Sequence, residues 1–343
     1  MTEATVHKPF NFFIRPIIQI VLMFCTAILL FSLSYYRMKD GKVVDMPPSL
    51  CAVEEQKNYL VNAEIKVGLF VRNFLEFDIL TNNFVADAYV WFEFDPHRIS
   101  LKAVEDFYFG KAVMEQKSHA YISQQKNKER VGYNVQIRFQ TNLDYRYFPI
   151  DSHRLYLTLN NAALQKHEAI FISSENSFQV APTVYASGWS YQGKSVKSGL
   201  QLNVLDQSTN TKLISPRTIF ALDFANESFK RFILIILPLF IIFFLSLFTL
   251  SIDPVKQYAT VVSIPAAMMG ALVSYFFVIE SMSPKVGYFT LADIFFSVFV
   301  VLNFMIFILD TICIKYFVRY RGLLVIMFHG LLISAWLFLL YWW

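Results

Sequence analysis

Five long apolar runs constrain this chain more than any other feature. They span residues 17–36, 232–251, 258–279, 288–314 and 323–343. A helix needs about 20 apolar residues to cross the ~30 Å of hydrocarbon in a bilayer, and each run is long enough. The first three runs contain no charged residue, the fourth carries Asp293 and Asp310 near its ends, and the fifth carries His329. The sequence therefore predicts a membrane protein with five transmembrane helices.

The overall composition excludes several other classes of protein. Hydrophobic residues make up 55% of the chain and charged residues 16%, whereas soluble proteins contain about 45–50% and about 25%. This composition excludes a disordered chain and argues against a wholly soluble one. The net charge of +4 is small and its residues are scattered, so a nucleic-acid partner is not expected. Cysteines at 25, 51 and 313 do not form the pattern of a disulfide framework.

The first apolar run is either a cleaved secretion signal or a retained signal-anchor. The apolar core of a secretion signal usually covers about 7–15 residues, and this run is longer, so we favour the anchor. Lys8 and Arg15 then place the N-terminus in the cytosol. We expect three parts: residues 1–36, an aqueous domain at 37–229 and a helical domain with four apolar runs at 230–343. The aqueous domain would lie outside the cytosol (periplasmic or extracellular), next to the cell or inner membrane.

The aqueous domain has the alternation of apolar and polar residues that is typical of half-buried strands. It is unbroken over residues 133–140, and similar patterns recur at 65–71, 84–94, 155–159, 200–204 and 218–224. Many short strands without intervening helices favour an antiparallel β-sandwich. We expect the Lys- and Gln-rich residues 116–130 to form a solvated loop and residues 206–216 to form a loop that links two strands.

Five motifs occur in the order found in one known family. They are the run YFPIDSHRL at 147–155, VGLFV at 67–71, NFVADAYVW at 83–91, Pro238 inside the second apolar run, and ESMSPK at 280–285. Together with the predicted sandwich followed by four helices, these motifs resemble the pentameric ligand-gated ion channels, or Cys-loop receptors. The resemblance covers roughly residues 60–343.

The resemblance implies a homopentamer in membrane lipid, with a sandwich and four channel helices in each subunit. The first apolar run would add a fifth, peripheral helix. The short connection at 315–322 is similar to that of bacterial members, and the family's disulfide positions hold Thr141 and Leu155. The family's agonist would correspond here to a small-molecule or ionic stimulus that the sequence does not identify.

The third apolar run, residues 258–279, corresponds to the family's pore-lining helix. The family register places Ser263, Ala267, Gly270, Ser274 and Phe277 on the pore face, and their spacing is that of one helical stripe. Ala259 and Glu280 would lie at the two pore mouths. Small residues at this spacing also let helices pack closely in membranes, which is the alternative interpretation.

Three residues in this run depart from the family pattern. Where the family usually has a bulky aliphatic residue, this chain has Gly270, and where it often has an acidic residue at the cytosolic mouth, this chain has Ala259. Pro265 lies off the stripe and is either a tolerated kink or a gating hinge. Phe277 is the only large apolar residue on the stripe, so we expect it to form a hydrophobic constriction.

The family's gating interface corresponds to the loop around residue 150 and the outer loop between the second and third channel helices. The residues in question are Phe148, Pro149, Asp151, Arg231, Met282, Pro284 and Lys285. The usual arginine partner of the loop aspartate is replaced by Asn226, so Arg231 is a displaced candidate partner for Asp151. Asp151 could instead cap a turn.

The family's agonist pocket uses aromatic residues, which hold amines by cation–π attraction. Tyr89 and the cluster Phe107, Tyr108 and Phe109 match contributing positions, although core packing is the simpler expectation for them. Residues 206–216 contain no aromatic residue, so we do not expect an amine pocket of the usual kind.

Two other classes of function compete with an ion channel. No phosphate loop, paired-cysteine metal site or zinc-protease motif supports an enzyme, a cofactor or a metal. His329 could sense protons, but packing is the simpler role for a lone histidine. A non-conducting pentameric receptor or scaffold is the stronger alternative, because Ala259, Gly270 and Pro265 are unusual in a pore.

Overall fold

The computed structural model describes residues 15–39, 45–50, 63–125, 127–164, 169–206, 211–226, 229–311 and 320–342. The chain divides into two compact units. A helical unit comprises Met1–Gly41, Tyr145–Asp151 and Ser228–Trp343, and a β-rich unit comprises Lys42–Asp144 and Ser152–Glu227. Cys51, Cys313 and most of the 315–322 connection lie outside the described residues.

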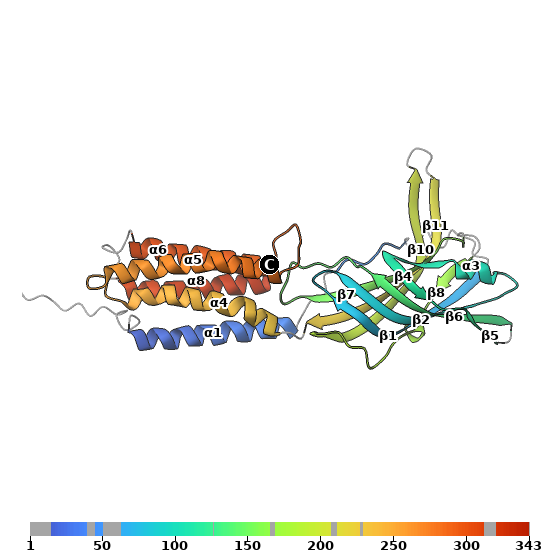
Figure 1. Cartoon of the computed structure of the whole chain (residues 1–343), viewed down its shortest axis with the longest axis horizontal. Coiled ribbons are helices and arrows are strands. Elements are labelled where there is room, and N and C mark those ends of the chain that lie inside the picture. The colour runs from blue at the N-terminus through green and yellow to red at the C-terminus, as the bar shows by residue number, and fades with distance from the viewer. Residues whose placement is uncertain are drawn as a thin grey trace, which may run out of the picture. The chain divides into compact units, whose positions relative to one another are not determined.

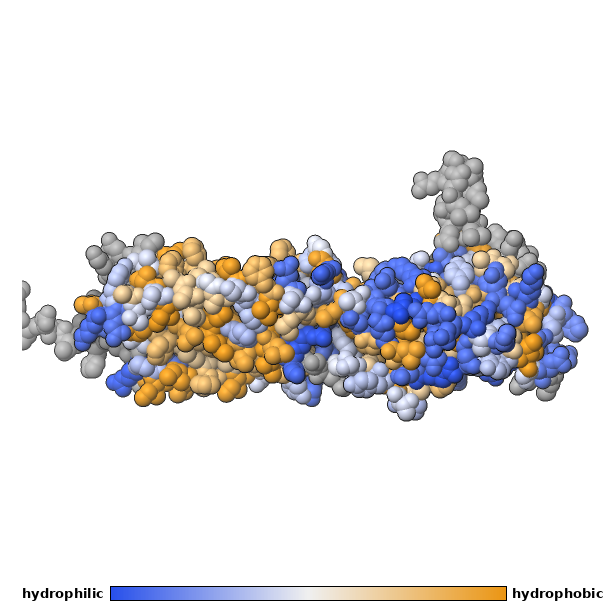
Figure 2. Space-filling view, in the orientation of Figure 1, coloured by the Kyte–Doolittle hydropathy of each residue, from blue (hydrophilic) through white to orange (hydrophobic). Residues whose placement is uncertain are grey.

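The prediction of five apolar helices is confirmed. Within the described residues, five helices are long and apolar enough to cross a membrane. They are α1 (Pro16–Lys39), α4 (Phe229–Phe248), α5 (Tyr258–Met282), α6 (Leu291–Thr311) and α8 (Arg321–Tyr341). Figure 1 shows them running side by side. In Figure 2, hydrophobic residues cover most of the visible surface of this unit, as expected where lipid is the solvent.

Helix α1 directs polar residues inward and apolar residues outward. Its buried residues include Gln19, Thr26 and Ser34. Thr26 Oγ1 shares a 2.9 Å hydrogen bond with His329 Nδ1, and Trp336 Nε1 donates a 3.0 Å hydrogen bond to Ser34 Oγ. Polar contacts between helices hold membrane bundles together because lipid cannot satisfy these groups. α1 is therefore bonded to α8 by side chains along its length.

A buried polar cluster joins three other segments of the helical unit. Asp310 on α6 accepts hydrogen bonds from Thr249 Oγ1 at 2.5 Å and from Arg321 Nη2 at 3.3 Å. Arg321 also donates to the carbonyl of Ile252, which precedes α5. Asp310 and Arg321 are 1% and 4% exposed. A buried charge needs a partner, so this pair fixes the ends of α6 and α8 against the segment between α4 and α5.

The β-rich unit contains two sheets among its described residues. The larger is ordered β4-β6-β2-β1-β8, with β5 on β6 and β9 on β1; the smaller is ordered β10-β11-β7-β3. The larger sheet consists of β1 (Ala63–Asp78), β2 (Asn83–Phe94), β4 (Ala112–Lys117), β5 (Tyr121–Gln125), β6 (Lys128–Phe139), β8 (Ala169–Ile172) and β9 (Phe178–Val180). The smaller consists of β3 (Phe107–Gly110), β7 (Ser152–Asn161), β10 (Trp189–Asp206) and β11 (Thr211–Asn226).

Alternation of residue type produces a core that contacts both sheets. On β6, the odd-numbered residues from Val131 to Phe139 are buried, as the period of a strand requires. Aromatic rings from the two sheets meet in this core: Phe77 of β1 and Phe224 of β11 have ring centroids 4.8 Å apart, and Phe178 and Phe220 have centroids 5.0 Å apart. Each predicted strand segment lies within an observed strand, except that β6 ends at Phe139, one residue before the predicted end at 140.

Two predicted loops are wrong. Residues 116–130 contain β5 and the first residues of β6, and β5 pairs with β6 from Tyr121 to Gln125. β5 is an exposed strand at the edge of the sheet, and both of its faces meet solvent. This exposure accounts for the Lys- and Gln-rich composition of residues 116–130. Residues 211–216 belong to β11 and pair with β10. Only residues 207–210 separate the two strands, and they lie outside the described residues.

Candidate functional site

All five predicted pore-lining residues of α5 are exposed. Ser263, Ala267, Gly270 and Ser274 lie on one exposed face with Phe277, whose exposed fraction is 66%. The buried residues of α5 are Val261, Pro265, Leu272 and Ile279. Ala259 and Glu280, the predicted mouth residues, are exposed near the two ends of the helix. The stripe therefore points away from the other described helices of the chain.

The middle of this face consists of small side chains, and its serine hydroxyls bond to carbonyls of their own helix. Ser263 Oγ donates to the carbonyl of Thr260 at 3.3 Å, and Ser274 Oγ donates to the carbonyl of Gly270 at 3.1 Å. No atom lies within 4 Å of the position that a Cβ of Gly270 would occupy. The hydroxyls are satisfied by their own helix, so this face needs no partner within the subunit. Within the described part of the chain, this face is therefore not closely packed against another helix.

Pro265 faces the opposite direction, toward the rest of the bundle. Its side chain is buried, and α5 packs against α4 and α6. The helix continues unbroken from Tyr258 to Met282 despite the proline. Neighbouring helices thus surround the position where proline removes a backbone hydrogen bond, which is how membrane helices tolerate it.

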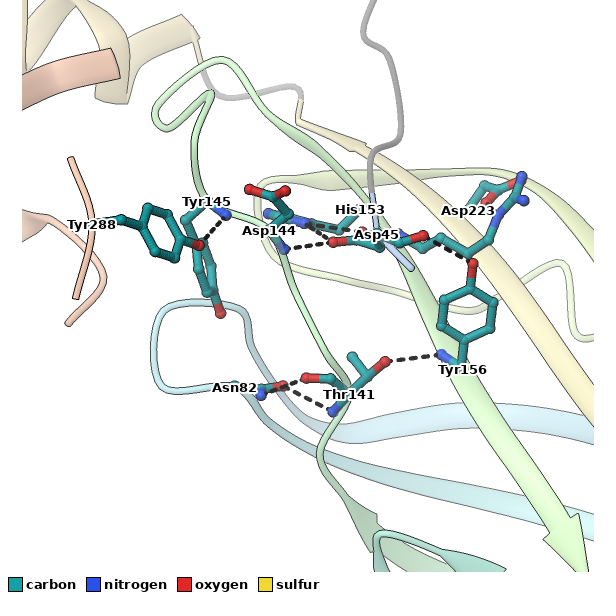
Figure 3. A network of polar contacts seen from close by, with 10 residues as sticks. Asp45, Asn82, Thr141, Asp144, Tyr145, His153, Tyr156, Asp223 and Tyr288 are labelled. Carbon is teal, nitrogen blue, oxygen red and sulfur yellow. Dashed lines mark hydrogen bonds and ion pairs between the residues drawn. The ribbon is translucent and has the colours of Figure 1, made fainter. Parts of the chain in front are cut away.

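The loop Tyr145–Asp151 belongs to the helical unit. Phe148 is 1% exposed, and the bond between Phe148 and Pro149 is cis. The Tyr145 N–H donates a 2.9 Å hydrogen bond to Tyr288 Oη, from the segment that connects α5 and α6 (Figure 3). Two carbonyls of the loop, those of Arg146 and Phe148, accept hydrogen bonds from Leu291 N at 2.8 Å and from Ala292 N at 3.0 Å.

These contacts complete the N-terminal cap of α6. The first four N–H groups of a helix lack partners within it. Here Thr290 N donates to Asp293 Oδ2 at 2.8 Å, and Asp293 N donates to Thr290 Oγ1 at 3.4 Å, which is a reciprocal capping box. The two intervening N–H groups, of Leu291 and Ala292, donate to the loop carbonyls. The loop is therefore part of the helix cap, and α6 begins at Leu291 rather than at the predicted 288.

The gating-interface residues occupy different environments. Phe148, Pro149, Asp151 and Pro284 are buried, Arg231 and Met282 are half-buried, and Lys285 is exposed. The described hydrogen bonds of the loop include those to Tyr288, Leu291 and Ala292, and its predicted contact with residues 282–285 stays a prediction. The ion pairs found among the described residues do not include one between Asp151 and Arg231, and this pairing stays a prediction. Arg231 is the third residue of α4, which begins at Phe229.

A buried carboxylate in the β-rich unit holds the two chain segments that flank this loop. Asp45 Oδ1 accepts from Asp144 N at 2.7 Å, and Asp45 Oδ2 accepts from Arg154 N at 2.6 Å (Figure 3). His153 Nδ1 lies 3.2 Å from Asp45 Oδ2, and both side chains are almost fully buried. Asp45 therefore fixes the residues just before and just after the loop. Sequence reasoning missed Asp45, because a lone aspartate in an irregular segment carries no pattern.

The predicted aromatic ligand positions divide into core and surface. Phe107 and Phe109 are each 3% exposed and belong to the core, whereas Tyr108 is 42% exposed. Tyr89 is half-buried, and its hydroxyl lies over Gly132, where an added Cβ would approach to 1.8 Å. Core packing thus accounts for Phe107 and Phe109, and the four side chains do not form one aromatic cage.

Charged groups surround the Phe107 ring without forming an amine site. The Lys117 ammonium lies 4.3 Å from the Phe107 centroid and 4.7 Å from that of Tyr133. Burial lowers the pKa of Lys117. Tyr133 Oη donates to Glu105 Oε1 at 3.0 Å. The pKa of Tyr133 is raised, mainly by burial and to a smaller extent by this hydrogen bond. The chain's own lysine therefore occupies the place beside these rings that a cationic ligand would need.

No known family model matches this chain, and no curated protein matches it either. The resemblance to pentameric ligand-gated channels thus rests on the sequence motifs alone.

Proposed function

We propose that this chain is one subunit of a homopentameric ion channel in which α5 lines the conduit. The observation that carries the proposal is the exposed face of α5, on which Ser263, Ala267, Gly270 and Ser274 lie in one stripe. Only 17% of the most apolar window of α5 is buried, against 28–56% for the other four helices. The helix whose apolar window is least buried is thus the one that the motifs assign to the pore.

The chemistry of this face favours water or another subunit over lipid. Glycine, alanine and serine offer little apolar surface to hydrocarbon, whereas five such stripes around one axis would form rings that leave room for hydrated ions. A C5 arrangement buries the flanks of each α5 against its neighbours and leaves the stripe on the axis. Five Glu280 carboxylates at one mouth would then favour cations.

Phe277 is the proposed constriction of this conduit. Its ring is 66% exposed in the subunit, and five such rings would form an apolar girdle that gates by dewetting. Phe276 provides a matched control, because its ring packs on Phe296 of α6 at 5.3 Å. Phe277→Ser should raise the resting conductance of reconstituted protein, and Phe276→Ser should not. Equal currents in the wild type and in Phe277→Ser would remove Phe277 as the gate.

The β-rich unit would act as a sandwich outside the cytosol that receives the stimulus. Its two sheets share a core of aromatic rings, which supports a sandwich. The loop Tyr145–Asp151 caps α6, and the residues at both of its ends are fixed by Asp45 in the β-rich unit. Movement of β7 would therefore pull directly on the backbone that caps α6, which packs against α5.

Counting the subunits and recording single channels test the proposal together. Native mass spectrometry of the purified protein should give five copies, and planar bilayers should show unitary currents under some combination of pH, divalent ions and membrane tension. A monomer or dimer would contradict the proposal. An intact pentamer that stays silent under every condition would contradict conduction and favour the non-conducting receptor or scaffold.

A further inference from the structure

A pocket of about 370 Å³ lies on one face of the smaller sheet. The even-numbered residues Tyr156, Thr158 and Asn160 of β7 line it, while the odd-numbered residues from Leu155 to Leu159 are buried in the core. The segment 45–50 lies over the same face, because Leu50 packs beside Tyr156 and Tyr156 Oη donates to the carbonyl of Asp45 at 3.2 Å. The pocket volume is within the range of small-molecule sites, about 300–1,000 Å³.

Arg217 is the charged group at the centre of this pocket. Tyr108 on β3, Asn160 on β7 and Arg217 on β11 are directly opposite one another on adjacent strands, so their side chains share one face. Arg217 is 9% exposed. Its Nε donates to Asn160 Oδ1 at 2.7 Å, its Nη1 donates to the carbonyl of Ser49 at 3.0 Å, and its Nη2 donates to Gln201 Oε1.

All three acceptors of Arg217 are neutral. Burial lowers the pKa of this guanidinium, but arginine stays protonated in proteins. Among the described residues that line the pocket there is no carboxylate, and Lys111 adds a second positive charge. In the same unit, Arg72, Arg138 and Arg154 are all more exposed and each pairs with a carboxylate. Arg217 is therefore the most deeply buried of these four arginines, and no carboxylate in the described pocket lining balances its charge.

We propose that this pocket binds a small organic acid, with Arg217 holding its carboxylate. A guanidinium has five N–H donors, and three have partners here, so two remain for a carboxylate. A buried cation is stabilised most by a bound anion, because desolvation strengthens their attraction. The rest of the lining suits an organic body: Tyr108 supplies an aromatic wall, and Thr158 and Tyr156 supply hydroxyls. One buried charge matches a monoanion better than a phosphate dianion.

Titration of the purified full-length protein tests this site without any measurement of ion current, so its outcome is independent of the proposed channel. The probes are acetate, benzoate and lactate, with phosphate and chloride at equal ionic strength. Isothermal calorimetry should show saturable binding of at least one carboxylate, tighter than that of phosphate or chloride. Arg217→Gln should weaken it roughly tenfold to a hundredfold, as expected when a charge-assisted hydrogen bond is lost. Arg72→Gln, in the other sheet, should leave it unchanged.

A second variant distinguishes loss of binding from misfolding, because Arg217→Gln could weaken binding by disturbing the fold. Tyr108 is exposed and lines the pocket, so Tyr108→Ala should weaken the same carboxylate without changing the thermal unfolding of the protein. The proposal is overturned if none of the three acids binds saturably, if phosphate binds more tightly than all of them, or if both pocket variants bind as the wild type does.

Discussion

Helices α1 and α5 are the two least buried of the five apolar helices, yet they bury and expose different side chains. The outward residues of α1 include Ile17, Phe24 and Ile28, which are 77%, 67% and 64% exposed, while Gln19, Thr26 and Ser34 are buried. The exposed stripe of α5 contains serine, alanine and glycine together with Phe277, and α5 also exposes Val273, at 62%. α1 has the pattern of a helix at a lipid boundary, whereas the stripe of α5 contains the small residues that let membrane helices approach closely.

The largest expected effect comes from placing a lysine in the middle of each exposed face. A lysine at the centre of a lipid-facing helix costs about 2.5–3.5 kcal/mol, so Ile28→Lys should reduce membrane insertion roughly a hundredfold. Gly270→Lys should insert as the wild type does, because its face would be hydrated. The fraction of protein that resists alkaline carbonate extraction measures this. Equal loss in both variants would mean that the two faces meet the same solvent.

The next effect concerns the cap of α6, a helix that packs more extensively on α5 than on α1. Asp293→Ala removes the acceptor of the capping box and should destabilise the protein by about 0.5–2 kcal/mol. Asp293→Asn keeps an acceptor oxygen and should cost less. Hydrogen exchange should increase along α6 and α5 and stay unchanged along α1. Faster exchange spread equally over all three helices would show that the cap does not act locally.

The smallest expected effect concerns the inward polar residues of α1. Thr26→Val removes the hydrogen bond to His329 and should lower the stability of the detergent-solubilised protein by about 0.6 kcal/mol, the average for such bonds in a membrane. Ile28→Val, on the outward face, should change stability less. Thermal unfolding in one detergent gives both values. A larger cost for Ile28→Val would argue that the outward face of α1 is packed rather than lipid-exposed.

The sequence predicted the helices and most strands well, because each depends on a pattern of side chains. Five apolar runs had to be helical, since a spanning segment must satisfy its own backbone. β5 was missed because Tyr121 and Ile122 are adjacent and three polar residues follow them, so no alternation marks it as a strand. β11 was predicted too short because Thr211 and Lys212 look like turn residues, while backbone pairing extends the strand past them.

Parts of the candidate site could be predicted and others could not, because prediction again depends on a pattern of side chains. The face of α5 was assigned from the family resemblance, and its spacing is that of one helical stripe. Its five residues are exposed, while their role in a pore stays a prediction. The contact between the loop and α6 could not be placed, because it is made by the backbone carbonyls of Arg146 and Phe148, which have no sequence signature. One signal was present: Thr290 and Asp293 have the spacing of a capping box before an apolar run. Arg217 had no such signal, because only the fold reveals that its neighbours are neutral.

The most direct test of the account is the reaction of two single cysteines with a charged, membrane-impermeant thiol reagent in sealed vesicles. One variant keeps only the native Cys25, which is free and exposed on α1, and the other carries only Ser274→Cys on α5. If α1 meets lipid and α5 meets an aqueous conduit, Ser274→Cys should react and Cys25 should not. Rapid labelling of Cys25 together with an inert Ser274→Cys would contradict the central claim that the exposed face of α5 lines the pore.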